Sequence, residues 1–254
     1  MPIILFLLQL FFFKFSVIAQ EDYQSAQQTY LQQQQQYQQN YLNYIEKKDT
    51  YTKYGTITAK KEKIESAKKA IISRNLLLQY YLSALNIKLR KYADNNPTTT
   101  KKNQIEINKW IAWLKEQNAI VSTFTNQDDL SVNAKSFSKK YILIKQQIYT
   151  SLIQNQVNHY QQILQQLSQL SQDIQNNPQI NDQAQNWISD LSIKKDLAQE
   201  KLKRATQLMN QNTQHGQPAN SYPTSKKEIL KAKQYSVQIL QDLKSIIVKF
   251  YQSQ

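Results

Sequence analysis

Few residues in this chain are of the types that perform acid-base, nucleophilic or metal chemistry. The chain has no cysteine, and its two histidines are His159 and His215. A zinc site of ordinary ligand number would therefore need carboxylates to complete it. No catalytic motif, phosphate-binding loop, dinucleotide-binding fingerprint or EF-hand loop occurs. We assign no catalytic, cofactor-binding or metal-binding residue, and we interpret His159 as a polar residue beside a helix seam.

Two pairs of carboxylates are spaced closely enough for one member to act as an acid and the other as a base. Glu62 and Glu65 lie among several lysines, so ion pairing on a helix surface explains them. Asp128 and Asp129 follow a polar stretch, and either of them is predicted to cap the N-terminus of the next helix. Both pairs have structural explanations, and we predict that the protein is not an enzyme.

The charge of the chain is strongly positive and is carried almost entirely by lysine. The formal net charge is +14, and the only arginines are Arg74, Arg90 and Arg204. Positive charge favours acidic partners, but base-specific recognition relies largely on arginine, so sequence-specific nucleic-acid binding is not expected. An anionic membrane surface or another polyanion remains a candidate partner. Solvated helix faces, which need no partner, are the simpler interpretation of the lysines.

The first 19 residues predict a secretory signal peptide. The apolar block from Ile3 to Phe13 has the length of a signal core, and Val17 and Ala19 place small residues at a cleavage site. Lys14 interrupts the apolar stretch, and no basic residue precedes it. An uncleaved anchor is the alternative, but the stretch is shorter than the ~20 residues of a spanning helix. We predict a secreted protein that begins at Gln20.

The backbone composition predicts helices. The chain has two glycines and five prolines, which are too few for the many tight turns of an all-β or doubly wound fold. Between them, long segments repeat apolar or aromatic side chains at heptad spacing. We predict an all-α fold, an elongated antiparallel helical bundle with coiled-coil-like heptad seams and about six helices. Because no disulfide can form, packing of these seams must stabilise it.

The clearest seams lie in the first half of the chain. One stripe holds five tyrosines at seven-residue spacing, Tyr23, Tyr30, Tyr37, Tyr44 and Tyr51. Leu31, Leu42 and Ile45 are expected to widen it, and Gly55 is expected to end this helix in a left-handed conformation. The next seam consists of Ile57, Ile64, Ile71, Leu78, Leu85 and Tyr92. Core packing is the expected role of both, and a binding face is the alternative for the tyrosines.

Four further helices follow. Their apolar positions include Ile107, Trp110, Ile111 and Leu114, then Ile153, Tyr160, Leu167 and Ile174, then Ala184, Trp187, Leu191, Ala198, Ala205 and Leu208, and finally Ile229, Ala232, Ile239, Leu243, Ile246 and Phe250. Breaks are expected at residues 95–97 and 176–178, where two asparagines precede a proline. The longest loop is expected from Gly216 to Pro223. Ser225 and Glu228 then match a capping box that opens the last helix.

A joint near residue 125 is expected to divide the chain. The predicted parts are a signal peptide at residues 1–19, an N-terminal helical bundle region at 20–125 and a C-terminal one at 126–254, or one continuous domain in place of the two regions. Glutamines recur at residues 32–36 and between residues 161 and 172. Compositional bias that fills solvent positions is the first interpretation, and amide hydrogen bonds between copies are the alternative.

These observations favour a secreted, noncatalytic structural or protein-interaction module that binds a protein partner or associates with itself. No cofactor is expected. The alternative is a secreted membrane-active protein that binds anionic lipid or forms pores. Association in water would support the first interpretation, and salt-sensitive binding to anionic vesicles would support the second.

Overall fold

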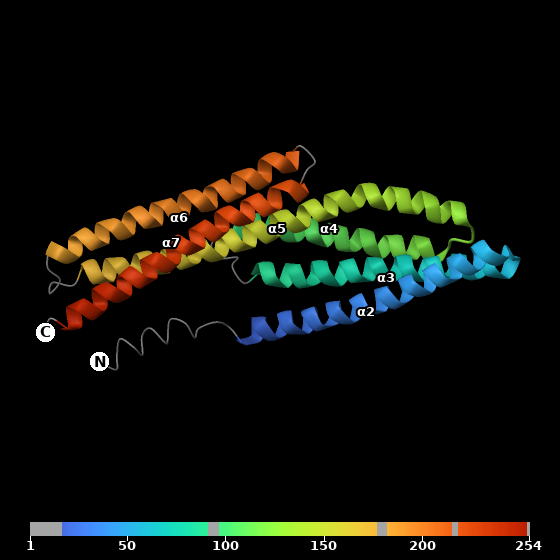
Figure 1. Ribbon diagram of the computed structural model, residues 1–254, viewed down its shortest axis with the longest axis horizontal. Coiled ribbons are helices and arrows are strands. Elements are labelled where there is room, and N and C mark those ends of the chain that lie inside the picture. The colour runs from blue at the N-terminus through green and yellow to red at the C-terminus, as the bar shows by residue number, and fades with distance from the viewer. Residues whose placement is uncertain (1–16, 91–96, 177–181, 215–217, 253–254) are drawn as a thin grey trace. The chain divides into compact units, whose positions relative to one another are not determined.

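Six helices make up the described part of the chain. The computed structural model describes residues 17–90, 97–176, 182–214 and 218–252. Its helices are α2 (Val17–Tyr54), α3 (Ile57–Arg90), α4 (Pro97–Ser122), α5 (Gln127–Gln175), α6 (Asp182–Gln214) and α7 (Pro218–Gln252) (Figure 1). The described residues contain no strand, so the predicted all-α helical bundle is confirmed. Most of the predicted signal peptide, residues 1–16, lies outside the described residues.

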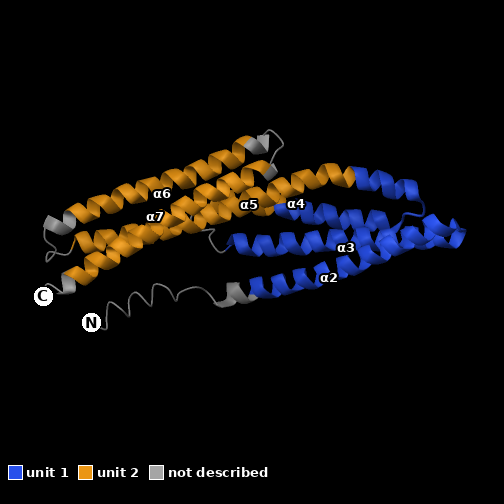
Figure 2. Cartoon of the chain, in the orientation of Figure 1, with its two compact units in different colours: residues 1–91, 107–135 blue, residues 92–106, 136–254 orange. Residues whose placement is uncertain are grey.

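The helices divide into two compact units, which Figure 2 shows in different colours. Unit 1 contains α2, α3 and residues 107–135, which are the end of α4 and the beginning of α5. Unit 2 contains the beginning of α4, the rest of α5, and helices α6 and α7. The division into regions 20–125 and 126–254 stays a prediction of the sequence.

A tight turn at Gly55 joins α2 to α3. Gly55 has a φ of 64°, and its N–H donates to the carbonyl of Tyr51 over 2.9 Å. The predicted left-handed end of the first helix is therefore confirmed, at a position where a residue with a Cβ would be strained. The Thr56 hydroxyl accepts a hydrogen bond from the Ala59 N–H over 3.1 Å and so caps α3. The two helices pack as an antiparallel hairpin (Figure 1).

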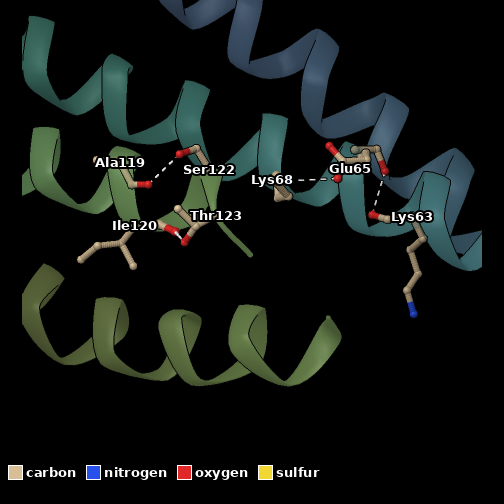
Figure 3. Close-up of polar contacts among 8 residues, drawn as sticks. Lys63, Glu65, Lys68, Ala119, Ile120, Ser122 and Thr123 are labelled. Carbon is tan, nitrogen blue, oxygen red and sulfur yellow. Dashed lines mark hydrogen bonds and ion pairs between the residues drawn. The ribbon is translucent and has the colours of Figure 1, made fainter. Parts of the chain in front are cut away.

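The end of α4 is closed by hydroxyl side chains. Ser122 donates to the Ala119 carbonyl over 2.6 Å, and Thr123 donates to the Ile120 carbonyl over 2.8 Å (Figure 3). These bonds supply partners to carbonyl groups near the end of the helix, where intrahelical N–H donors run out. The chain then turns into α5.

The N-terminus of α5 corrects a sequence prediction. The residue that caps it is Asn126, whose Oδ1 accepts a hydrogen bond from the Asp129 N–H over 2.9 Å. The Asn126 amide also donates to the Asp129 carboxylate over 2.8 Å. The expectation that Asp128 or Asp129 is the cap was wrong because both lie in the first turn, where their negative charges favour the helix dipole instead.

The core of unit 1 lies along one face of α3. Leu82, Leu85 and Leu89 are buried there, but much of the rest of the face consists of small residues, Ala59, Ser66, Ala67, Ala70 and Ser73. Small side chains let neighbouring helices approach closely. The larger Ile71 and Leu78 are half-buried at the margin of this face of α3. The predicted seam is confirmed at Ile64 and Leu85 and is wrong at Ile57, which is 77% exposed. Tyr92 lies outside the described residues.

Amide side chains link the helices of unit 1. The bonds, each 2.9–3.0 Å long, join Asn75 to Asn118, Asn86 to Asn108, and Asn133 to Gln117. Asn75, Asn86 and Asn133 are buried, so a shift in register would leave amide groups without partners in the core. These bonds therefore favour one register among α3, α4 and α5.

The core of unit 2 is a three-helix seam formed by α5, α6 and α7. Its buried members include Ile153, Val157, Leu164, Leu191, Ala198, Leu202, Ala205, Ala232, Ile239, Leu243 and Ile246. Three alanines among them, Ala198, Ala205 and Ala232, are completely buried, which shows how closely the helices approach. The apolar seams predicted for the last two helices are confirmed at most of their described positions, but Trp187 and Leu208 are half-buried and the buried residue beside Leu208 is Met209.

The last helix begins earlier than predicted. α7 starts at Pro218 and contains Pro223, so the expected loop from Gly216 to Pro223 is wrong over its last six residues. Proline is favoured at the first helical position, which suits Pro218, whereas Pro223 lies inside the helix and leaves one backbone hydrogen bond unmade. The expected capping box is also wrong, because Ser225 and Glu228 are buried within the helix and Glu228 pairs with Lys231 over 2.7 Å.

Candidate functional site

The residues that could have carried acid-base chemistry are spread along the chain. His159 lies half-buried on α5, and its ring centroid is 5.1 Å from that of Tyr160. His215 lies outside the described residues. Across the described ranges, no group of three or more histidine and carboxylate side chains is placed to hold a metal ion.

The carboxylates Glu62 and Glu65 take part in ion pairs, as the sequence predicted. Glu65 pairs with Lys68 over 3.0 Å on the surface of α3 (Figure 3). Glu62 reaches across to α2, where it pairs with Lys47 over 3.0 Å. The hydrogen bond to Glu62 raises the pKa of the Lys47 ammonium, and the negative charge adds to this effect. The Glu62–Lys47 pair therefore joins α2 to α3, whereas the Glu65–Lys68 pair lies within α3.

The tyrosine stripe of α2 faces α3, yet none of its five tyrosines is buried. Tyr30 contacts Tyr81 of α3 with ring centroids 5.5 Å apart, and the Lys88 ammonium lies 5.8 Å from the ring centroid of Tyr23. All five members of the stripe are half-buried. The stripe is therefore an aromatic contact at the edge of unit 1 and not an interior seam.

A second stripe, called here the outer α2 stripe, follows a different face of the same helix. It consists of Gln24, Gln28, Leu31, Gln35, Gln38 and Leu42, spaced alternately four and three residues apart, and all six are exposed. Leu31 is 48% exposed and Leu42 is 67% exposed. The expectation that they widen the tyrosine stripe was wrong, since one residue turns an α-helix by about 100° and carries Leu31 away from Tyr30.

The middle of α2 carries no charge. Between Asp22 and Glu46, residues 24–45 contain only glutamine, asparagine, serine, threonine, tyrosine and aliphatic side chains. The outer α2 stripe lies entirely in this stretch. In a chain with a net charge of +14, this is a long helical surface that another positively charged molecule approaches with little local repulsion.

A third surface, called here the outer α7 stripe, lies on α7 away from the core. Leu230, Val237, Leu240 and Val248 are each at least 40% exposed. Beside them, Lys226, Lys233 and Lys244 are exposed, and α7 carries six lysines against two acidic residues. Both acidic residues are already in ion pairs, Glu228 with Lys231 and Asp242 with Lys194. On this surface exposed lysines therefore alternate with exposed apolar side chains.

No described helix has both the length and the apolar character needed to cross a membrane. No protein-family model, curated protein or solved structure matches this chain. The sequence pattern indicated the glutamines and the tyrosines, but it assigned Leu31 and Leu42 to the wrong stripe. The alternating four- and three-residue spacing that starts at Gln24 is the signal that identifies the outer α2 stripe.

Proposed function

We propose that the protein is a secreted, noncatalytic helical module that associates with other copies of itself through the outer α2 stripe. The observation that carries this proposal is a continuous exposed stripe with Leu31 and Leu42 in an uncharged part of the helix. Secretion is supported by the apolar block at residues 3–13 and the small residues before Gln20.

The spacing of the outer α2 stripe suits pairing between helices. Alternation of four and three residues is the spacing of the contact positions in a coiled coil, and leucine is a favoured contact residue there. The glutamine side chains between the leucines each carry amide donors and an acceptor. Two copies of α2 lying side by side would bury the leucines and pair the amides across the contact.

The distribution of charge favours a second copy as the partner on this face. Two molecules that each carry a charge near +14 repel one another wherever their lysines meet. Residues 24–45 avoid that repulsion because they contain no lysine or arginine. They also offer no positive charge to attract an acidic partner, so a strongly charged partner gains no electrostatic attraction from this stretch.

The free energy of this contact is expected to be modest. Burial of the exposed part of each leucine side chain contributes about 1 kcal/mol. Several such leucines and amide pairs must act together to overcome the entropy that association costs. We therefore expect reversible association that depends on protein concentration.

Sedimentation velocity over a wide concentration range tests the proposal. The protein is collected from the medium of a secreting host, and its intact mass shows whether the chain begins at Gln20. We expect larger species of defined size to grow with concentration. They should persist at high salt, because the contact contains no ion pair to screen. The double variant Leu31→Ser and Leu42→Ser should remain monomeric.

The matched control is Ile57→Ser. Ile57 is more exposed than either leucine and lies in unit 1, but it is outside the outer α2 stripe. This control should associate as the unmodified chain does. A chain that stays monomeric at every concentration, or a double variant that assembles normally, would refute self-association through α2.

A second candidate function is binding to the surface of an anionic membrane. The observation that favours it is the outer α7 stripe, where lysines border exposed Leu230 and Val237. An amphipathic helix of this kind lies in the plane of the membrane surface, with apolar side chains inserted and lysines at the headgroups. This role requires no spanning helix.

A further inference from the structure

A cavity of about 340 Å³ lies within unit 1 among α2, α3 and the beginning of α5. Three tyrosines of α2 line one side, Tyr37, Tyr41 and Tyr44. Their rings follow one another, with centroids 6.0 Å apart between Tyr37 and Tyr41 and 6.4 Å apart between Tyr41 and Tyr44. Ile71 and Leu130 add apolar surface. The walls are therefore suited to a flat apolar group.

Two cationic residues of α3, Arg74 and Lys63, line this cavity, and Lys63 is the more deeply buried of the two. It is only 9% exposed, its ammonium donates to the Gln127 Oε1 over 2.6 Å, and it lies 4.1 Å from the ring centroid of Tyr51. Neither contact supplies a negative charge. The two nearest carboxylates along α3 pair with other lysines, Glu62 with Lys47 and Glu65 with Lys68.

Figure 3 shows the Lys63 side chain extending away from the paired Glu65 and Lys68. Burial lowers the pKa of the Lys63 ammonium, and the positive charges of Lys60 and Lys48 lower it further. A buried cation without a nearby anion is unfavourable because lost hydration is not replaced by an opposite charge. An anion that entered the cavity would supply that charge and would form a charge-assisted hydrogen bond.

We propose that this cavity binds a small organic anion with a flat apolar body, such as an aromatic carboxylate. The carboxylate contacts the Lys63 ammonium, and the aromatic ring packs among Tyr37, Tyr41 and Tyr44. Ser131, which also lines the cavity, lies on its α5 side. This site is independent of the outer α2 stripe, and its test does not depend on association between copies.

The test measures binding of 2-naphthoate by titration calorimetry, with the uncharged 2-naphthalenemethanol as the matched probe. The unmodified protein should bind 2-naphthoate about tenfold more tightly than the Lys63→Met variant does. The uncharged probe should bind both proteins equally, because it has no group for the ammonium to recognise. Lys60→Met, which removes a neighbouring exposed lysine, should change 2-naphthoate binding less than about twofold.

Ser131→Phe keeps Lys63 and adds an aromatic ring at an exposed position that lines the cavity, which should narrow it. It should weaken binding of both probes while circular dichroism shows an unchanged helix content. Equal affinity of 2-naphthoate for the unmodified protein and Lys63→Met would overturn the proposal. So would undetectable binding at millimolar probe, or unchanged binding of both probes in folded Ser131→Phe.

Discussion

Lys63 also affects stability, and the direction of that effect follows from its pKa. The pKa is lowered from an ordinary value of 10.5, so the unfolded chain binds more protons than the folded chain between the lowered pKa and 10.5. Stability contributed by this group therefore rises with pH across that window. Below it, the cost of burying the ammonium is fully present. The hydrogen bond to Gln127 and the contact with Tyr51 offset part of this cost.

Replacement of Lys63 by methionine should stabilise the protein at neutral pH. We expect Lys63→Met to raise the free energy of unfolding by about 1 kcal/mol at pH 7, because an uncompensated buried charge is removed. The gain should shrink as the pH rises toward 10.5, because the lowered pKa makes the folded lysine lose its proton more readily than the unfolded one. Urea denaturation at the two pH values measures it. Lower stability of the variant at pH 7 would contradict the assigned cost of burial.

At the scale of the elements, α3 supplies the central face of unit 1. Leu82 is completely buried on that face, whereas Leu78 is half-buried at its margin. Leu82→Ala should lower the free energy of unfolding by about 2 to 5 kcal/mol, because it leaves a cavity in a closely packed core. Leu78→Ala should cost about half as much, since less apolar surface leaves water. Urea denaturation of both variants gives the comparison.

A surface leucine provides the control for these two variants. Leu31→Ala removes the same atoms from an exposed position and should change the free energy of unfolding by less than about 0.5 kcal/mol at low protein concentration. Equal costs for Leu82→Ala and Leu78→Ala would mean that the buried face of α3 is centred elsewhere.

At the scale of the whole molecule, the net charge of +14 decides which surfaces attract which partners. If the outer α7 stripe binds membranes, the protein should sediment with vesicles containing phosphatidylserine, and binding should weaken as salt is raised. Leu230→Ser with Val237→Ser should reduce this binding, while Val132→Ser, at an exposed site on α5, should not. Equal binding to uncharged phosphatidylcholine vesicles would contradict the role of the lysines.

The sequence alone predicted the helices well because their signals are local. Heptad spacing identifies an amphipathic helix wherever it packs, and the scarcity of glycine and proline leaves few places to end one. Gly55 could be assigned as a left-handed helix end because that conformation is strained for other residues. Pro223 was misread as a loop residue, since the sequence does not show how near it lies to a helix start.

Only the tertiary structure decided which side of each helix is buried, which amides pair and where a cavity forms. Leu31 and Leu42 belong to a periodic pattern whether they are buried or exposed. Only the packing of α2 against α3 shows that they are exposed. The hydrogen bond between Asn75 and Asn118 likewise joins residues distant in the chain. The separation of Lys63 from carboxylates also depends on which residues the fold places around it. Periodicity is a property of one helix, whereas burial and pairing depend on the neighbours that a helix acquires on folding.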